Sequence, residues 1–257
     1  MDNLFNVQSL SFSYGKNKVI DDITFDIKKG IVTTLIGANG CGKSTLFNLM
    51  TKNLHADKGK ILLADKNIDD IKIKDYAKMA AIVHQYNTAP HDISVKDLVS
   101  YGRTPYQSFG IPKNVDEDEE KITKALEITN TLKYKDKPVS QLSGGQKQRV
   151  WLAMALAQST DILFLDEPTT YLDISYQLQI LKLVRKLNMD FGISIIMVLH
   201  DINQALYYSD EIIAMKKGKI ISKGKASDMV NTETIKNVFD VELEVFKAGE
   251  KAFMLTI

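Results

Sequence analysis

Hydrophobic and polar positions alternate near the start of the chain, as they do in strands with one buried face. The run 31–36 is rich in β-branched residues and ends at a glycine, which predicts a buried parallel strand. A glycine-rich turn follows, and apolar residues after it mark one face of a helix. The apolar positions of the opening strands and of this helix are Leu4, Val7, Leu10, Phe12, Ile23, Phe25, Ile27, Leu46, Leu49 and Met50.

The pattern changes between about Tyr86 and Val139, where apolar residues follow helical spacing. The residues with this spacing are Val95, Leu98, Val99, Ile122, Ala125 and Leu126. The region is therefore predicted to be a mainly helical insertion.

Strands and helices alternate again after the insertion. The predicted elements are helices over 146–158 and 174–188, strands over 162–165 and 193–199, and a short helix beyond His200. From Glu211 onward we expect a hairpin around Lys217-Gly218, one or two short helices and closing strands. Strands that alternate with helices predict a mostly parallel sheet covered on both faces.

The chain is predicted to be one α/β domain over residues 1–257. Residues 1–85 and 151–257 would form the core with its β subdomain, and residues 86–150 the helical subdomain. A hydrophobic fraction of 44% and a charged fraction of 25% are ordinary for a globular protein. The net charge of +1 gives no overall attraction to nucleic acid, so no nucleic-acid partner is expected.

Three features of the sequence bear on the cellular location of the protein. The single cysteine, Cys41, cannot form an internal disulfide, which suits the reducing cytosol. The N-terminus lacks the basic and apolar regions of a signal peptide. The longest strongly apolar stretch, 193–199, is far shorter than the roughly 20 residues that span a bilayer. If the protein serves transport, other chains must therefore supply the pore.

A candidate phosphate-binding loop lies between the strand 31–36 and the following helix. It fits the pattern G-x-x-x-x-G-K-[ST] in full and, with the next residue, consists of Gly37, Ala38, Asn39, Gly40, Cys41, Gly42, Lys43, Ser44 and Thr45. Backbone N–H groups and the helix dipole can hold phosphate oxygens there. We expect Lys43 to reach the β- and γ-phosphates, Ser44 to bind Mg²⁺, and Thr45 to lie near the α-phosphate. The loop alone does not distinguish among kinases, GTPases, helicases and transporter ATPases. The lack of a convincing guanine-reading segment favours ATP over GTP as the nucleotide.

A second candidate anion site is the segment Leu142-Ser-Gly-Gly-Gln146 at the start of a predicted helix. Ser143 and Gln146 have the spacing of a capping box. Gly144 and Gly145 leave backbone N–H groups open to an anion. Because a cap does not require two glycines, we interpret the segment as a second phosphate-binding helix terminus.

Taken together, these motifs resemble those of the ABC ATPase family, and the resemblance covers nearly the whole chain. LSGGQ is the family signature, and Asp166 and Glu167 follow the predicted strand 162–165 as the family requires. The resemblance implies an α/β P-loop NTPase with a RecA-like parallel-sheet core, an N-terminal antiparallel β subdomain and a helical insertion subdomain. It also implies hydrolysis of ATP with Mg²⁺, in which Asp166 contacts the metal and Glu167 is the general base.

Four further site residues follow from the resemblance. Tyr14 is similar to the aromatic residue that stacks on adenine, and Gln85 to the glutamine that touches Mg²⁺ and water. Asp173 ends the segment Tyr171-Leu-Asp, which resembles a loop that contacts a second subunit. His200 resembles the switch histidine that contacts the γ-phosphate. The remaining histidines, which match no family role and are expected at the surface or in packing, are His55, His84 and His91.

The resemblance also implies partners. The loop 37–45 of one subunit would face the segment 143–146 of a second copy, with ATP between them in a head-to-tail dimer. The helical insertion that begins near Gln85 would accept a short helix of an integral membrane permease. The chain would then lie in the cytoplasm against the inner face of the membrane, and a substrate-binding protein would act with it indirectly.

Two stretches resemble a narrower group. Residues 94–106, which contain Gly102-Arg103-Thr-Pro105, are similar to importers of iron–siderophore complexes, haem and cobalamin, although Tyr106 stands where a histidine is usual. Residues 168–175 are similar to the siderophore-importer form. We expect a ferric siderophore as cargo, with haem, cobalamin, zinc and manganese as alternatives. A soluble ABC ATPase of iron–sulfur cluster assembly is the rival from another class.

Overall fold

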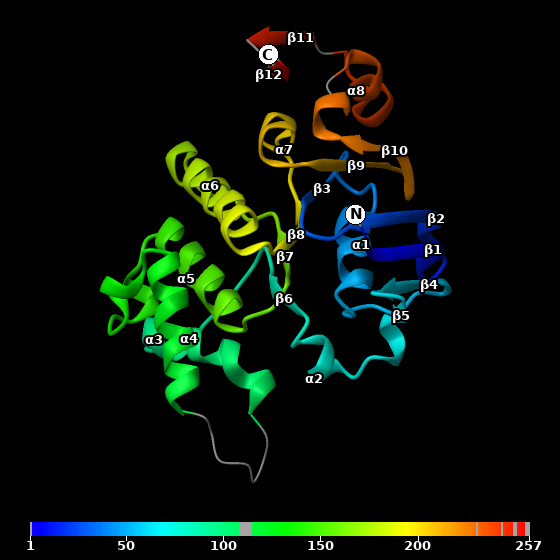
Figure 1. Cartoon of the computed structure of the whole chain (residues 1–257). Helices are drawn as coiled ribbons and strands as arrows, with labels where there is room; N and C mark the ends of the chain where they lie inside the picture. Colours follow the sequence, from blue (N-terminus) through cyan, green and yellow to red (C-terminus); the bar gives the residue numbers. More distant parts are fainter. Residues whose placement is uncertain (1, 108–114, 230, 243, 249–250, 255–257) are drawn as a thin grey trace.

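The computed structural model describes residues 2–107, 115–229, 231–242, 244–248 and 251–254 (Figure 1). A six-stranded sheet runs through the middle of this described part, with the strand order β10-β9-β3-β8-β7-β6. Its strands are β3 (Val32–Ile36), β6 (Ala80–Val83), β7 (Ile162–Asp166), β8 (Ser194–Val198), β9 (Glu211–Lys216) and β10 (Lys219–Lys225). All neighbours pair in parallel except β9 and β10, so the predicted parallel sheet is confirmed.

A four-stranded antiparallel sheet is formed by the N-terminal part of the chain, in the order β2-β1-β4-β5. Its strands are β1 (Asn3–Tyr14), β2 (Asn17–Lys28), β4 (Lys58–Leu63) and β5 (Lys66–Asn67). The pairing of β1 with β2 shifts between Val7 and Leu10, and Ser9 has a left-handed backbone with φ 46°. This bulge explains why buried residues of β1 lie three apart at that point instead of two.

The helices lie between these strands in the sequence and after the last of them. They are α1 (Lys43–Met50), α2 (Ile73–Tyr76), α3 (Val95–Ser100), α4 (Val115–Ile128), α5 (Gly144–Ala157), α6 (Ile174–Phe191), α7 (Ile202–Tyr208) and α8 (Thr232–Phe239). Short 3₁₀ helices include η1 (Ile68–Asp70), η2 (Tyr101–Tyr106), η3 (Leu132–Tyr134), η4 (Val139–Gln141) and η5 (Ala226–Met229). A C-terminal hairpin of β11 (Val245–Ala248) and β12 (Lys251–Met254) follows. Helix α6 runs three residues beyond the predicted end and stops at Gly192, whose φ of 68° suits a glycine.

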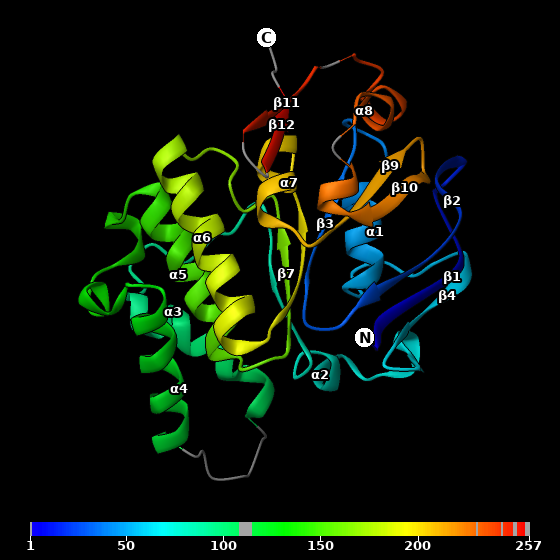
Figure 2. The same cartoon turned by 45° about the horizontal axis from the view of Figure 1, so that its top comes forward.

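Two hydrophobic clusters lie on opposite faces of the central sheet. Alternate residues of β7 divide between them: Leu163 and Leu165 belong to one cluster, and Ile162 and Phe164 to the other. The first cluster includes residues of α3 to α7, and the second includes α1 and the four-stranded sheet. Figure 1 and Figure 2 show the helices α3 to α6 gathered on one side and the antiparallel sheet on the other. The sheet is thus covered on both faces, as predicted.

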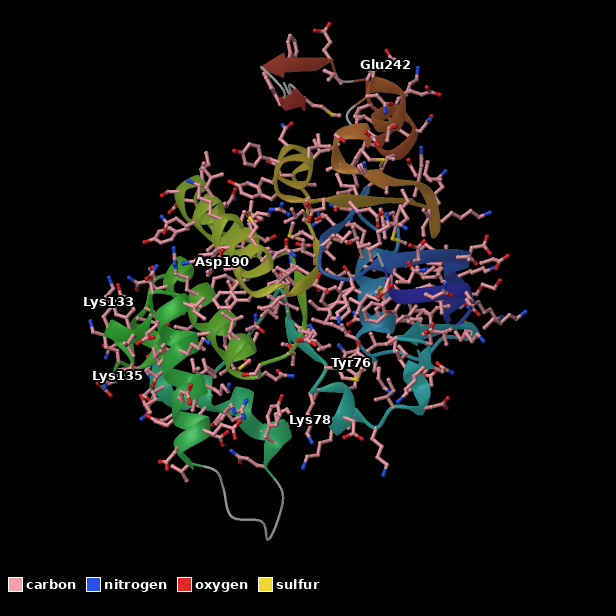
Figure 3. The ribbon with its side chains drawn as sticks, viewed as in Figure 1. Tyr76, Lys78, Lys133, Lys135, Asp190 and Glu242 are labelled. Atoms are coloured by element: carbon pink, nitrogen blue, oxygen red, sulfur yellow. The ribbon has the colours of Figure 1, made fainter. Side chains whose placement is uncertain are left out.

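The insertion is mainly helical, as expected, and its helices α3 and α4 pack against α5. This helix is continuous from Gly144 to Ala157, so the boundary expected between residues 150 and 151 falls inside it. Lys133 and Lys135 lie at the outer edge of this helical part (Figure 3). None of the helices in the described ranges has the length and apolar character that a membrane crossing needs.

The segment Gly102-Arg103-Thr-Pro105-Tyr106 has a packing role in η2. A Cβ on Gly102 would lie 2.1 Å from the carbonyl oxygen of Met154, so η2 rests directly on the backbone of α5. Arg103 is only 3% exposed, and its Nε and Nη1 donate to Asp118 Oδ1 (2.7 Å) and to the Ala157 carbonyl (2.9 Å). Its guanidinium also stacks on the Tyr106 ring, 4.1 Å from the centroid. The segment therefore joins α4 to the end of α5.

Candidate functional site

The candidate site lies along the edge where the parallel strands of the central sheet end. The strand order places β3, β8, β7 and β6 side by side, and each is followed by a predicted site residue. The glycine-rich loop follows β3, His200 comes shortly after β8, Glu167 directly follows β7, and Gln85 comes shortly after β6. Ligands of open α/β sheets bind beyond the carboxyl ends of the strands. The fold therefore brings these four parts of the sequence to one edge.

The glycine-rich loop is held by the hairpin between β9 and β10. Gly37 has φ 148°, and a Cβ there would lie 2.2 Å from the Met215 carbonyl oxygen. Gly42 caps α1 with φ 109°. The backbone N–H of Gly218 donates to the Cys41 carbonyl at 2.9 Å. Glycines are needed at 37 and 42 because of these backbone angles and close approaches.

Lys43 lies across this loop with its side chain buried. It is 5% exposed, and its Nζ donates to the carbonyl oxygens of Gly37 (2.8 Å) and Ala38 (3.2 Å). The rim of the loop, Ala38 to Gly40, is exposed, as is Ser44, whereas Thr45 is buried. An exposed rim above a buried ammonium group at a helix N-terminus is suited to an anion.

The Glu167 carboxylate is held by other side chains of the site. Its Oε2 accepts hydrogen bonds from Gln85 Nε2 (2.5 Å) and Thr170 Oγ1 (3.1 Å), and its Oε1 pairs with His200 Nε2. Its backbone is left-handed (φ 50°), and its N–H donates to the Val198 carbonyl at 3.2 Å. A non-glycine residue in this region is unfavourable unless its surroundings hold it. The structure thus fixes the Glu167 carboxylate from three sides.

Asp166 has a different environment. Burial, and then the neighbouring Glu167 charge, raise its pKa from 3.8 to about 6, while His200 and Lys43 oppose the shift. Its Oδ1 is buried and has no hydrogen-bond partner among the described residues. A buried carboxylate oxygen without a partner is costly, and a divalent cation would satisfy it. The residues present therefore fit Mg²⁺ at this point.

The segment 143–146 forms the N-terminus of α5, as predicted, and the capping box is present. Gln146 N–H donates to Ser143 Oγ (3.4 Å), and the Ser143 N–H donates to Gln146 Oε1 (3.0 Å). A Cβ on Gly145 would lie 2.2 Å from the Tyr176 ring, whereas on Gly144 it would meet Leu172 at 3.6 Å. Packing against α6 therefore requires the second glycine, which sequence reasoning had explained by anion binding alone. Gly144 remains exposed.

The two glycine segments lie in different parts of the fold. The loop 37–45 leads into α1 on the side of the antiparallel sheet, whereas 143–146 begins α5 among the helices of the other side (Figure 1), and among the described residues no hydrogen bond joins them. Asp173 lies beside the second segment and caps α6, because its Oδ1 accepts from the Tyr176 N–H at 3.0 Å. Gln146 is further held by Tyr134, whose hydroxyl accepts from its Nε2 at 3.0 Å. The signature and Asp173 thus belong to a second group, separate from the first.

The remaining predicted residues are aromatic or imidazole side chains. Tyr14 is 52% exposed at the end of β1, with its ring edge-to-face to Phe12 at 4.9 Å. His55 and His91 are exposed and pair with carboxylates. His84 lies partly buried against the Phe47 ring, and burial lowers its pKa. These positions agree with a surface or packing role for the three histidines.

Sequence reasoning predicted the hairpin around Lys217-Gly218, which is present as β9 and β10, but not its contact with the phosphate-binding loop, and it did not identify Thr170. Thr170 comes three residues after Glu167, and only the turn that follows β7 brings its hydroxyl back to the carboxylate. The contact of Met215 and Gly218 with the phosphate-binding loop depends on the pairing of β3 with β9. The Lys217-Gly218 turn predicted the hairpin itself, but nothing local indicates what the hairpin touches.

Comparison with known proteins agrees with this geometry. A family model described as ABC transporter matches residues 20–170. The iron(3+)-hydroxamate import ATP-binding protein FhuC of Bacillus subtilis (strain 168) is 45% identical over 243 residues, which cover 95% of this chain and 90% of that protein. The ferric enterobactin transport ATP-binding protein FepC of Escherichia coli (strain K12) is 40% identical over 232 residues, covering 90% of this chain and 85% of that protein.

A solved structure resembles the fold over nearly its whole length. It is cbiO1 from Clostridium perfringens, which is part of the ABC transporter complex cbiONQ. The TM-score is 0.80 and the identity is 32%, over 91% of this chain and 93% of that chain.

Proposed function

Because the chain belongs to the ABC transporter family, whose cassettes bind ATP, we propose that it is the ATP-hydrolysing subunit of an importer. The observation that carries the proposal is the Glu167 carboxylate, which Gln85, Thr170 and His200 hold beside Asp166. A carboxylate fixed in this way can accept a proton from an attacking water, which is the role of a general base.

The other candidate site residues at this edge of the central sheet bind and orient the nucleotide. Lys43 turns from its loop carbonyls to the β- and γ-phosphates, and the N–H groups of 37–45 hold the phosphate oxygens. Tyr14 supplies an exposed ring for the adenine base. His200, which pairs with Glu167, would contact the γ-phosphate.

Ser44, Gln85 and Asp166 are the residues that would hold Mg²⁺. When bound, the ion neutralises charge that develops on the β- and γ-phosphates. The unpartnered Asp166 Oδ1 supports this assignment. The Gln85 side chain is placed to orient the water, because its amide already donates to the base that would receive the proton.

The dimer completes the site. Cassettes of this family form dimers and work with membrane permease components. We place the segment 143–146 and Asp173 of a second copy against the nucleotide, head to tail, because the two glycine segments of one chain lie in different parts of the fold. The exposed Gly144 N–H and the Ser143 hydroxyl would then contact the γ-phosphate from the partner. Closure on ATP and opening after hydrolysis would drive the attached permease.

The cargo we propose is a ferric siderophore. Relatives whose names state iron(3+)-hydroxamate import and ferric enterobactin transport match 90% or more of the chain. The chain would lie at the cytoplasmic face of the membrane, bound to permease subunits that receive cargo from a substrate-binding protein.

Replacing Glu167 by Gln tests the proposed role of Glu167 as the general base. The amide keeps the shape but cannot take a proton, so kcat should fall by about 10² to 10⁴ while ATP binding is retained. Phosphate release and nucleotide binding are measured on the same preparation, with Glu233→Gln on the distant α8 as the matched control. Undiminished turnover of the Glu167→Gln protein would remove Glu167 from this role.

Transport assays test the cargo. The chain is purified with its permease, placed in vesicles, and supplied with ATP and a ferric hydroxamate, a ferric catecholate, haem, cobalamin, Zn²⁺ or Mn²⁺. ATP-dependent accumulation of a ferric siderophore is the expected result. Accumulation of only another compound would show that this compound, and not a ferric siderophore, is the cargo. Failure of any permease to co-purify would favour a soluble ABC ATPase.

A further inference from the structure

Two exposed tyrosines from distant parts of the chain are hydrogen-bonded to each other. The hydroxyl oxygens of Tyr86 and Tyr171 lie 2.8 Å apart, and their ring centroids 6.1 Å apart. Tyr86 is 69% exposed and Tyr171 is 80% exposed. So much exposure means that burial of apolar area gives little reason for the two rings to meet.

Their position relates them to the candidate site. Tyr86 directly follows Gln85, and Tyr171 directly follows Thr170. Both Gln85 and Thr170 donate to the same oxygen of Glu167, Oε2. The loop after β6 and the loop after β7 are therefore joined twice, inside through Glu167 and outside through the phenols.

The backbone of Tyr171 is unusual for an exposed aromatic residue. Its φ is 62°, in the left-handed region that disfavours bulky side chains. Backbone hydrogen bonds from Thr170 N–H to the Glu167 carbonyl and from Leu172 N–H to the Thr169 carbonyl close the turns on either side. An unfavourable conformation that is retained at a site suggests a functional constraint.

We propose that the Tyr86–Tyr171 hydrogen bond is a clasp that holds the loop of Gln85 against the loop of Glu167, and that both tyrosines are positioning residues for turnover. This rests on the proposed function of Glu167 and Gln85. The two phenols bond to each other and not to the carboxylate, so each acts through its neighbour, Tyr86 on Gln85 and Tyr171 on Thr170.

The test compares Tyr86→Phe, Tyr171→Phe and the double variant, which keep both rings and remove only hydroxyl groups. Each single variant should lower kcat for ATP about 2- to 10-fold with little change in KM, as expected for loss of one hydrogen bond. The double variant should match a single one, because the same bond is broken in each. Tyr101→Phe, an exposed tyrosine on η2, is the matched control and should leave kcat unchanged.

A second readout, thermal unfolding, does not depend on activity. Thermal unfolding should stay the same in all variants, since both side chains are exposed. A merely structural role would lower thermal stability and would not lower kcat selectively.

The outcomes separate the clasp from the proposed function. Unchanged kcat in both single variants, with Glu167→Gln inactive, would overturn the clasp alone. Losses that multiply in the double variant would also overturn it, because the tyrosines would then act independently. Full activity of Glu167→Gln would overturn the proposed function itself.

Discussion

Asp166 and Glu167 are adjacent in the chain but have different surroundings. Glu167 receives hydrogen bonds from Gln85 and Thr170 and pairs with His200. Burial raises the pKa of Asp166 to about 6, and its Oδ1 has no hydrogen-bond partner within the described part of the chain. Environments that differ in this way separate two carboxylates into two roles. At the residue scale, this difference supports our proposal that Glu167 accepts the proton and Asp166 binds the cation.

Replacing Asp166 by Asn should stabilise the nucleotide-free chain near pH 7.5 and abolish Mg²⁺-dependent turnover. The folded-state pKa of about 6 exceeds the ordinary 3.8, so the charged form is unfavourable in the folded chain above pH 6. This cost fades as the pH falls from 6 toward 3.8, and the gain from Asn should fade with it. Urea unfolding at several pH values measures the effect, and a gain that does not change with pH would contradict it.

At the scale of elements, α5 and α6 are fitted together at the signature. Gly145 lets the Tyr176 ring lie against the first turn of α5, while Gly144 faces outward. The Ser143 capping box and the predicted helix could be read from the sequence, because they depend on local spacing. The reason for Gly145 could not, because Tyr176 is brought there only by the packing of α6.

Gly145→Ala should destabilise the chain by about 1 to 3 kcal/mol, the usual cost of an added group in a packed contact. Gly144→Ala is the matched control, since its Cβ would make an ordinary contact and the position is exposed. Chemical denaturation measures both. Equal stability of the two variants would show that the Tyr176 contact does not constrain the helix.

At the scale of the whole molecule, the central sheet brings the first group of candidate site residues to one edge. The helical part carries the second group, the segment 143–146. Alternating strands and helices predicted the parallel sheet, and the glycine loop, Asp166 and Glu167 were placed at its edge by strand ends. The contacts of Met215 and Tyr86 were not predictable, because they join segments whose proximity depends on strand order. The contact of Thr170 was not predictable either, because it depends on the turn that follows β7. The separation of 37–45 from 143–146 is what makes a second copy necessary in our account.

The most direct test is a cross-link between two copies. In a Cys41→Ser, Glu167→Gln background, one chain carries Asn39→Cys and a second, tagged chain carries Ser143→Cys, so that no chain holds both cysteines. With ATP and Mg²⁺ under mild oxidation, a disulfide should form between the two chains, and it should be absent without nucleotide. If both chains bind ATP and still remain unlinked, including in the presence of the permease, the shared phosphate site is contradicted.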